Sequence, residues 1–254
     1  MALLRDRSEP QGSASFVEVL LLTRPANSTF APRAEVFPGG SVDVTDLDPG
    51  WAELGTEVDS NPEFERHLLV AAVRETFEEC GVLLVRDKSG HPCPPKLVAQ
   101  LASLRRRSQA GAPERFLVSL TEAGVRPGWE DLVFCAHWVT PEGLPRIFDT
   151  RFFAAALPQG QEPSLDTPGE VESLRWSRPS AALGEAYRGQ TQILPPTRAV
   201  LELLETHSTV AQALGAIRGS RIERVQPKLE EVTSARYPGL DPEAILDRKG
   251  EGDS

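Results

Sequence analysis

Three glutamates, Glu75, Glu78 and Glu79, lie close together in the otherwise largely apolar stretch AAVRETFEECGVLLV. On a helix, positions 75 and 79 are one turn apart, and position 78 lies on the same flank. Like charges at this spacing repel each other by roughly 0.2–0.5 kcal/mol per pair. Two interpretations follow. One is an acidic surface patch in which Arg74 pairs with Glu78; the other is a site for a hard cation, Mg²⁺ or Mn²⁺, which prefers oxygen ligands.

A helix is predicted to carry these carboxylates. Asn61 fits its N-cap, Pro62 fits its first position, and Gly81 fits its C-terminal cap. Upstream, the FPGG turn at Phe37–Gly40 offers a backbone without side chains, which can approach a ligand closely. This second feature moves the interpretation away from a plain surface patch and toward a binding site.

Strands and helices are mixed along the chain, which predicts an α/β or α+β fold. The predicted domain covers residues 15–218, between a flexible N-terminus at 1–14 and an irregular tail at 219–254. A helical insertion is expected at about 95–125. Strands are predicted at 15–24, 131–141, 146–158 and 170–176, and helices at 113–124, 178–189 and 195–219, the last as one amphipathic stretch.

The net charge and the number of cysteines disfavour nucleic-acid-binding, membrane-binding and disulfide-rich proteins. The formal net charge is −10, which disfavours binding to nucleic acids or to anionic membranes. Three cysteines in a chain of this length do not suggest a disulfide framework and favour a reducing compartment. No stretch resembles a signal peptide or a transmembrane span. We therefore expect a cytoplasmic protein without nucleic-acid or membrane partners.

The sequence resembles the Nudix box, a glycine followed six residues later by a glutamate and then by R-E-U-x-E-E-x-G-U, where U is aliphatic. Asp46 stands at the position of the first glutamate, and Thr76 at an aliphatic position. The 34 positions from Gly40 to Arg74 exceed the pattern, which indicates an insertion at about 47–61. The remaining positions agree with the box: Gly40, Arg74, Glu75, Glu78, Glu79, Gly81 and Val82.

Flanking segments narrow the resemblance. The stretch LLLTRPANSTFAPRAEVFPGGSVDVTD is similar to the segment before the box in coenzyme A diphosphatases of the Nudix family. Within these, it is most similar to the nucleoside diphosphate-linked moiety X motif 19 group. The likeness runs from about residue 15 to about residue 205. It implies an α/β fold of the Nudix type, an α/β/α sandwich with a mixed sheet and added helices.

The resemblance implies a mechanism, hydrolysis of a diphosphate with Mg²⁺ or Mn²⁺. Glu75 and Glu79 are then the principal metal ligands, and Glu78 is a further ligand or the general base. Arg74 holds the carboxylates in place through charge-assisted hydrogen bonds. The carbonyl group of Gly40 is a further candidate ligand. The predicted catalytic residues are therefore Arg74, Glu78 and Glu79.

Further residues are candidates for binding a small-molecule nucleoside diphosphate. Arg24 and Arg33 flank the loop before the box and can contact phosphates, and Gly39 can approach the substrate. Glu170 resembles a late acidic residue that completes the site in many family members. Whether the protein forms a homodimer is left open.

Three functions remain in competition. The leading hypothesis is cleavage of coenzyme A or acyl-coenzyme A into 3′,5′-ADP and phosphopantetheine or its acyl derivative. The second is the same chemistry on ADP-sugars or NAD(H). The third is a noncatalytic, ligand-binding Nudix domain, which the complete set of three glutamates disfavours. Substrate and product analysis with and without metal separates these hypotheses.

Overall fold

The computed structural model describes residues 1–9, 12, 15–54, 65–94, 96–98, 100–101, 114–142, 144, 147–165 and 171–232. The chain divides into two compact units. The first, which we call the box unit, comprises Met1, Pro38–Val133 and Ala155–Pro168. The second, the sheet unit, comprises Ala2–Phe37, Phe134–Ala154 and Gly169–Ser254.

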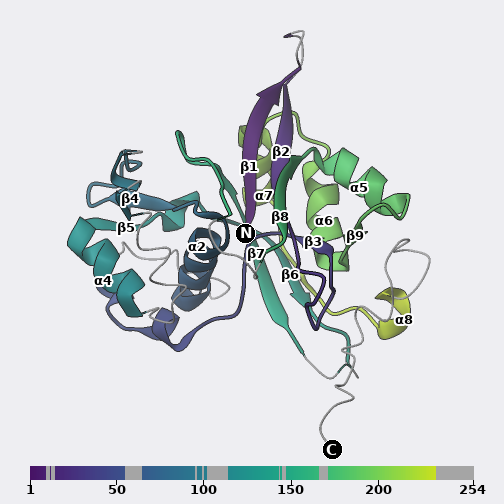
Figure 1. Ribbon diagram of the computed structural model, residues 1–254, viewed down its shortest axis with the longest axis horizontal. Helices are drawn as coiled ribbons and strands as arrows, with labels where there is room; N and C mark the ends of the chain where they lie inside the picture. Colours follow the sequence, from purple (N-terminus) through teal and green to yellow (C-terminus); the bar gives the residue numbers. More distant parts are fainter. Residues whose placement is uncertain are drawn as a thin grey trace, which may run out of the picture. The chain divides into compact units, whose positions relative to one another are not determined.

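The main sheet, which belongs almost entirely to the sheet unit, has eight strands in the order β10-β6-β7-β1-β2-β3-β9, with β8 pairing with β2 (Figure 1). Two pairs, β3 with β9 and β6 with β10, are parallel, whereas β2 pairs antiparallel with β1, β3 and β8. The sheet is therefore mixed, as predicted. The strands are β1 (Ala2–Ser8), β2 (Ser15–Thr23), β3 (Ala34–Val36), β6 (Val133–Val139), β7 (Asp149–Ala156), β8 (Ser173–Ser177), β9 (Gln192–Ile193) and β10 (Arg224–Val225).

Strand β2 is the central element of this sheet. Its residues Val19–Leu22 are at most 1 % exposed, because neighbouring strands flank it and both of its faces are covered. The pairs Leu4↔Val19, Leu20↔Trp176 and Leu22↔Val36 set its register with β1, β8 and β3. The continuous apolar run of β2 is thus explained by burial on both sides.

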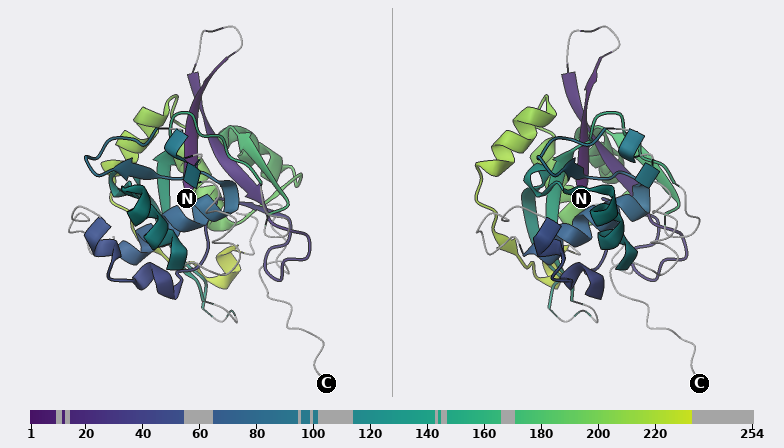
Figure 2. Two further views of the ribbon diagram at one scale, coloured as in Figure 1. Left: turned by 60° about the vertical axis from the view of Figure 1, so that its left-hand side comes forward. Right: turned by 90° about the vertical axis from the view of Figure 1, so that its left-hand side faces the viewer.

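Strand β1 corrects a prediction. Residues 1–14 were expected to be flexible, yet Ala2–Ser8 pair with β2, and both views of Figure 2 show the two strands side by side. Ala2, Leu3 and Leu4 are fully buried. Seven residues contain too little pattern to reveal a strand whose stability comes from a partner elsewhere in the chain.

Helices of the sheet unit are α5 (Pro179–Tyr187), α6 (Pro195–Leu204), α7 (Val210–Arg218) and the short α8 (Leu229–Val232). The single helical stretch predicted at 195–219 is wrong, because the chain leaves the helix after Leu204 and starts again after Thr209. The Thr209 hydroxyl accepts a hydrogen bond from the Gln212 N–H group at 3.2 Å and caps α7. In the predicted irregular tail, β10 and α8 are ordered elements, and residues 233–254 lie outside the description.

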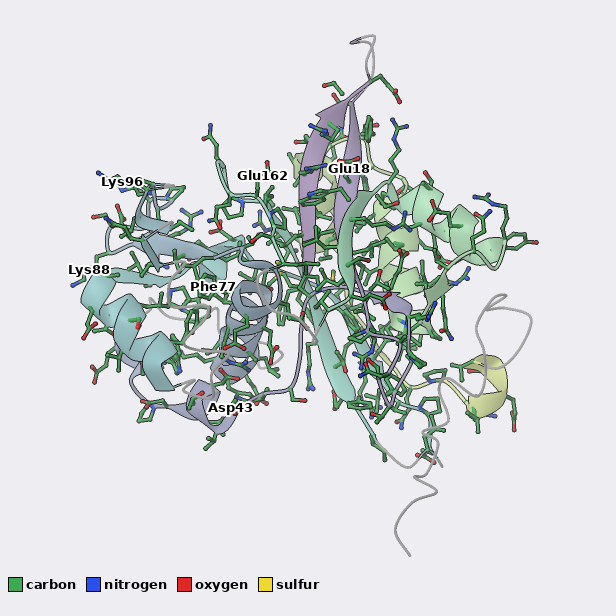
Figure 3. All side chains as sticks on the ribbon, viewed as in Figure 1. Glu18, Asp43, Phe77, Lys88, Lys96 and Glu162 are labelled. Atoms are coloured by element: carbon green, nitrogen blue, oxygen red, sulfur yellow. The ribbon has the colours of Figure 1, made fainter. Side chains whose placement is uncertain are left out.

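The box unit contains a second, two-stranded sheet, β4 (Val85–Asp87) with β5 (Val125–Pro127), and several helices. These are the 3₁₀ helix η1 (Val44–Leu47), α1 (Trp51–Leu54), α2 (Arg66–Cys80), α4 (Glu114–Ala123) and the 3₁₀ helix η2 (Trp129–Asp131). The rings of Phe77 and Phe116 stack at 5.8 Å, and Trp51 lies 5.9 Å from Phe116. These aromatic contacts fix α2, on which Figure 3 labels Phe77, against α1 and α4.

Helix α2 begins later than predicted. It starts at Arg66 with Glu65 as its N-cap residue, not after Asn61, and residues 61–64 lie outside the description. The predicted C-terminal cap is confirmed, because Gly81 has a left-handed φ of 73° and its N–H group bonds to the Phe77 carbonyl. Of the helical insertion expected at 95–125, α4 is a helix, whereas residues 102–113 lie outside the description. Among the described residues, no helix has the length and apolar content needed to cross a bilayer.

Candidate active site

The glycine turn before η1 lies directly against helix α2, and both belong to the box unit. A Cβ atom at Gly40 would lie 2.5 Å from the carboxyl carbon of Glu75, so a side chain at this position would displace that carboxylate. The neighbouring Gly39 donates its N–H group to Glu79 Oε2 at 2.7 Å. Gly39 has a φ of 152°, which residues with a side chain rarely adopt. The two glycines therefore shape the place where Glu75 and Glu79 lie.

Arg74 connects both halves of the box. Its Nε and Nη2 atoms donate to the two carboxylate oxygens of Asp46, each at 2.8 Å. Nη1 donates to Glu75 and to Glu78, each at 2.9 Å, and Nη2 also donates to the Ser41 carbonyl at 3.0 Å. Only 6 % of the Arg74 side chain is exposed. The prediction that Arg74 pairs with Glu78 is confirmed, and the guanidinium also holds three further acceptors.

Asp46 is the main residue whose role the sequence analysis missed. It appeared there only as a departure from the box, although it is fully paired with Arg74 and 2 % exposed. A capping box fixes it, since Asp43 accepts from the Thr45 N–H group and Asp46 accepts from the Asp43 N–H group. Trp51 Nε1 also donates to the Thr45 carbonyl at 2.8 Å. Its spacing of six residues from Gly40 already placed Asp46 in the box, and the acidic side chain kept at that position is the signal that could have identified its role.

The second departure from the box, Thr76, is also explained by the structure. Thr76 is fully buried on α2, where an aliphatic residue is expected. Its hydroxyl donates to the Ala72 carbonyl one turn earlier, at 2.6 Å. The polar group is thereby satisfied inside the helix, so burial carries no unpaired hydroxyl.

The electrostatics of this cluster are those of a site with excess negative charge. Burial raises the pKa of Glu75 above its ordinary value, although the charge and hydrogen bond of Arg74 act in the opposite direction. Burial by itself would lower the pKa of Arg74. The hydrogen bonds and charges of Asp46, Glu75 and Glu78 outweigh this effect and raise that pKa. Arg74 thus stays protonated, whereas Arg74 offsets only part of the cost of burying the charged Glu75 carboxylate.

The donor chemistry of the cluster fits a hard divalent cation. Glu75, Glu78 and Glu79 offer carboxylate oxygens from one helix, and a cation would relieve the cost of burying Glu75. In the arrangement described, Glu75 and Glu78 turn toward Arg74, and Glu79 turns toward Gly39. Accordingly, no three acidic, histidine or cysteine side chains converge on one point within the described residues.

Arg24 and Arg33 belong to the sheet unit, where the loop between β2 and β3 brings them together. Arg33 donates its N–H group to the Arg24 carbonyl at 3.2 Å, and Arg24 Nε donates to the Phe30 carbonyl at 3.1 Å. Arg33 is exposed and has a φ of 61°, a strained value for a residue with a side chain. Their contact with a substrate stays a prediction. Glu170 lies outside the described residues.

Comparison with known proteins places this cluster in a family. A family model described as the NUDT19 Nudix domain matches residues 65–203, which is more than half of the chain. The chain belongs to the Nudix family. The matched range contains the second half of the Nudix box on α2 but not Gly40 or Asp46. Those two residues are connected to the box by the contacts with Glu75 and Arg74.

Curated Nudix relatives include proteins named acyl-coenzyme A diphosphatase NUDT19. The one from Homo sapiens is 32 % identical over 231 residues, covering 74 % of this chain and 60 % of the relative. The one from Xenopus laevis is 28 % identical, covering 73 % and 59 %. A putative nudix hydrolase 7 from Caenorhabditis elegans is 30 % identical, covering 70 % and 52 %. The matches thus span only about 52–60 % of the length of these relatives.

A solved structure confirms the predicted Nudix-type α/β fold. The crystal structure of a NUDIX hydrolase from Alicyclobacillus acidocaldarius has a TM-score of 0.70 to this chain at 27 % sequence identity. The match covers 87 % of this chain and 95 % of that structure. Most of the architecture of this chain is therefore shared with a Nudix protein of known structure.

Proposed function

We propose that this protein is a metal-dependent diphosphatase that hydrolyses coenzyme A or acyl-coenzyme A. Water attacks one phosphorus of the diphosphate, the bond from that phosphorus to the bridging oxygen breaks, and a proton leaves the water. The products are 3′,5′-ADP and phosphopantetheine or its acyl derivative. The observation that carries this proposal is the buried carboxylate of Glu75, held against Gly40 and beside Glu78 by Arg74.

Glu75, Glu78 and Glu79 are the residues that would hold Mg²⁺ or Mn²⁺, with the Gly40 carbonyl oxygen as an additional ligand. The bound ion would supply neutralisation of phosphate charge and activation of water. The side chains of this chain have separate tasks. Arg74 orients Glu75 and Glu78, and the Gly39 N–H group orients Glu79. Glu78 or Glu79 takes the proton from the attacking water.

Two observations support coenzyme A as the substrate. Relatives that share about 30 % of aligned residues are named acyl-coenzyme A diphosphatases. In addition, Arg24 and Arg33 form no ion pair with any residue in the described part of the chain, and only Nε of the Arg24 guanidinium is used, in its hydrogen bond to the Phe30 carbonyl. We assign these arginines and Gly39 to substrate binding, and Glu170 to a supporting acidic role.

The proposal includes a cytoplasmic location and a small-molecule partner. The net charge of −10 disfavours an extended polyanion such as RNA, because such ligands need a surplus of basic residues. All three cysteines are free, and two of them are buried, which fits a reducing compartment. Light scattering measures whether the protein forms a homodimer.

The experiment that tests this function is product analysis by mass spectrometry. Purified protein is incubated with coenzyme A, acetyl-coenzyme A, ADP-ribose or NADH, each with Mg²⁺, Mn²⁺ or EDTA. We expect 3′,5′-ADP from coenzyme A, lost with EDTA and in the Glu79→Gln variant. Cleavage of only ADP-ribose or NADH would keep the chemistry and reject the substrate. Binding without turnover of any substrate would favour a noncatalytic domain.

A further inference from the structure

An exposed apolar segment follows directly after the glycine turn of the candidate active site. Val42, Val44 and Leu47 are 39 %, 78 % and 58 % exposed, although all three are apolar and lie within six residues of each other. They form what we call the 42–47 surface, next to Asp43, which Figure 3 labels. Single exposed apolar residues are common, but three within one short segment beside an acidic site point to a ligand or a partner.

The outward orientation of these side chains follows from how η1 is held. Asp46 points inward to Arg74, and Trp51 donates to the Thr45 carbonyl from the buried side. Asp43 closes the capping box at the start of η1. With these positions fixed, Val44 and Leu47 have no place in the core of the unit. The backbone that presents these side chains is therefore held by hydrogen bonds, which lowers the cost of binding.

The 42–47 surface is also tied directly to the candidate catalytic residues. Ser41, which precedes it, accepts a hydrogen bond from Arg74, and Gly40 lies against the Glu75 carboxylate. The segment therefore follows the two residues that contact Arg74 and Glu75 without a break in the chain, so a substrate held at Glu75 and extending along the chain from Gly40 would meet it next. Charge limits which group that is. Asp43 and Asp48 border the surface and would repel a second phosphate, whereas they tolerate an uncharged group.

We propose that the 42–47 surface binds the uncharged, aliphatic side of the diphosphate substrate and selects it over a sugar. This inference rests on the proposed function. In coenzyme A, a branched hydrocarbon group stands one methylene from the diphosphate, and removing it from water against Val44 and Leu47 is favourable. In ADP-ribose, the same position carries a ribose whose hydroxyl groups would lose water without gaining hydrogen bonds here.

The test compares two matched double variants in the box unit. Val44→Thr with Leu47→Gln makes the surface polar while retaining side-chain size. Val118→Thr with Leu165→Gln makes the same changes at positions that are 52 % and 39 % exposed elsewhere in the unit. Steady-state kinetics are measured with coenzyme A and with ADP-ribose. If ADP-ribose is not turned over, its inhibition constant against coenzyme A replaces its KM.

In the surface variant, we expect the KM for coenzyme A to rise about three- to thirtyfold, with kcat and the constant for ADP-ribose nearly unchanged. The control variant should keep both constants. An equal change for both substrates, no change, or the same change in the control would overturn the inference. So would a dimer that dissociates in the surface variant, because the surface would then be an interface between copies. If wild-type protein does not cleave coenzyme A, the proposed function itself fails.

Discussion

Each unit of the molecule contains an arginine that binds several carboxylates, yet the two networks differ. In the box unit, Arg74 contacts Asp46, Glu75 and Glu78 and is 6 % exposed. In the sheet unit, Arg175 contacts Glu35 and Glu185 and is 34 % exposed. Three acids with one guanidinium leave a net charge of −2, whereas two acids leave −1. The first network therefore has more uncompensated negative charge than the second.

The difference separates an interaction that positions reactive groups from one that joins structural elements. Arg175 connects β8 to β3 and to α5, and hydrogen bonds to Glu35 raise its pKa. Among the described glycines, none lies against Glu35 or Glu185 in the way that Gly40 lies against Glu75. In the box unit, Gly40 leaves room for Glu75, whose pKa is raised by burial. Excess buried charge beside a glycine is thus the feature that distinguishes the candidate active site.

Replacement of the two arginines should give the largest difference in stability. Arg74→Ala leaves Asp46, which is 2 % exposed, without a charged partner and with only the Asp43 N–H group as a donor, and we expect a loss of about 3–5 kcal/mol in the free energy of unfolding. Arg175→Ala should cost about half as much, because water can enter the space of a partly exposed side chain and solvate Glu35. Urea denaturation measures both values. A larger loss for Arg175→Ala would reverse the comparison.

Replacement of one glutamate in each network should separate activity from stability. Glu75→Gln should lower kcat about 10²–10³-fold, the effect of removing one charge-stabilising group. Glu35→Gln should leave kcat within about twofold and lower the free energy of unfolding by about 1–3 kcal/mol. Initial rates with saturating Mg²⁺, together with urea denaturation, provide the measurements. A comparable fall in kcat for Glu35→Gln would show that the sheet-unit network also acts in catalysis.

Replacement of one glycine in each unit should give smaller effects, which should be opposite in kind. In Gly40→Ala, the methyl group would displace the Glu75 carboxylate, so we expect kcat/KM to fall about 10- to 100-fold with little loss of stability. Gly215 lies on α7, where an added methyl group would meet no described atom within 4 Å, and Gly215→Ala should stabilise the protein by about 0.5–1 kcal/mol. Steady-state kinetics measure kcat/KM of both variants, and thermal unfolding measures their stability. Unchanged kcat/KM in Gly40→Ala would remove Glu75 from the site.

Replacement of Asp43 and Thr209, whose side chains cap η1 and α7, should have small effects on stability that differ in their pH dependence. Asp43→Ala and Thr209→Ala should each lower the free energy of unfolding by about 1 kcal/mol at neutral pH. The N–H group and hydroxyl of Thr45 lower the pKa of Asp43 below its ordinary value of 3.8. Its contribution is therefore present above pH 3.8 and disappears as the pH falls through the folded-state pKa. Urea titrations at several pH values should show no such change for Thr209→Ala.

Parts of the fold could be predicted because their signals are local. The apolar run of β2 and the left-handed cap at Gly81 are visible within a few residues, and the structure contains both. The start of α2 could not be predicted. Asn61 and Pro62 are typical of a helix start, yet the helix begins at Arg66 after Glu65, whose side chain forms no capping hydrogen bond that would mark the position. Strand β1 was missed because its stability depends on pairing with β2. The break between α6 and α7 did have a local signal, the capping residue Thr209.

The amino-acid sequence alone determined that Glu75, Glu78 and Glu79 share one helix face, because helical geometry fixes positions three and four residues apart. The surroundings of these glutamates depend on contacts between distant parts of the chain. Asp46 reaches Arg74 across 28 positions, and Gly40 reaches Glu75 across 35, contacts that no local rule specifies. Such contacts depend on packing, and no short segment carries that information. The rings of Trp51, Phe77 and Phe116 join α1, α4 and α2, and the hydrogen bond from Trp51 to the Thr45 carbonyl joins α1 to η1.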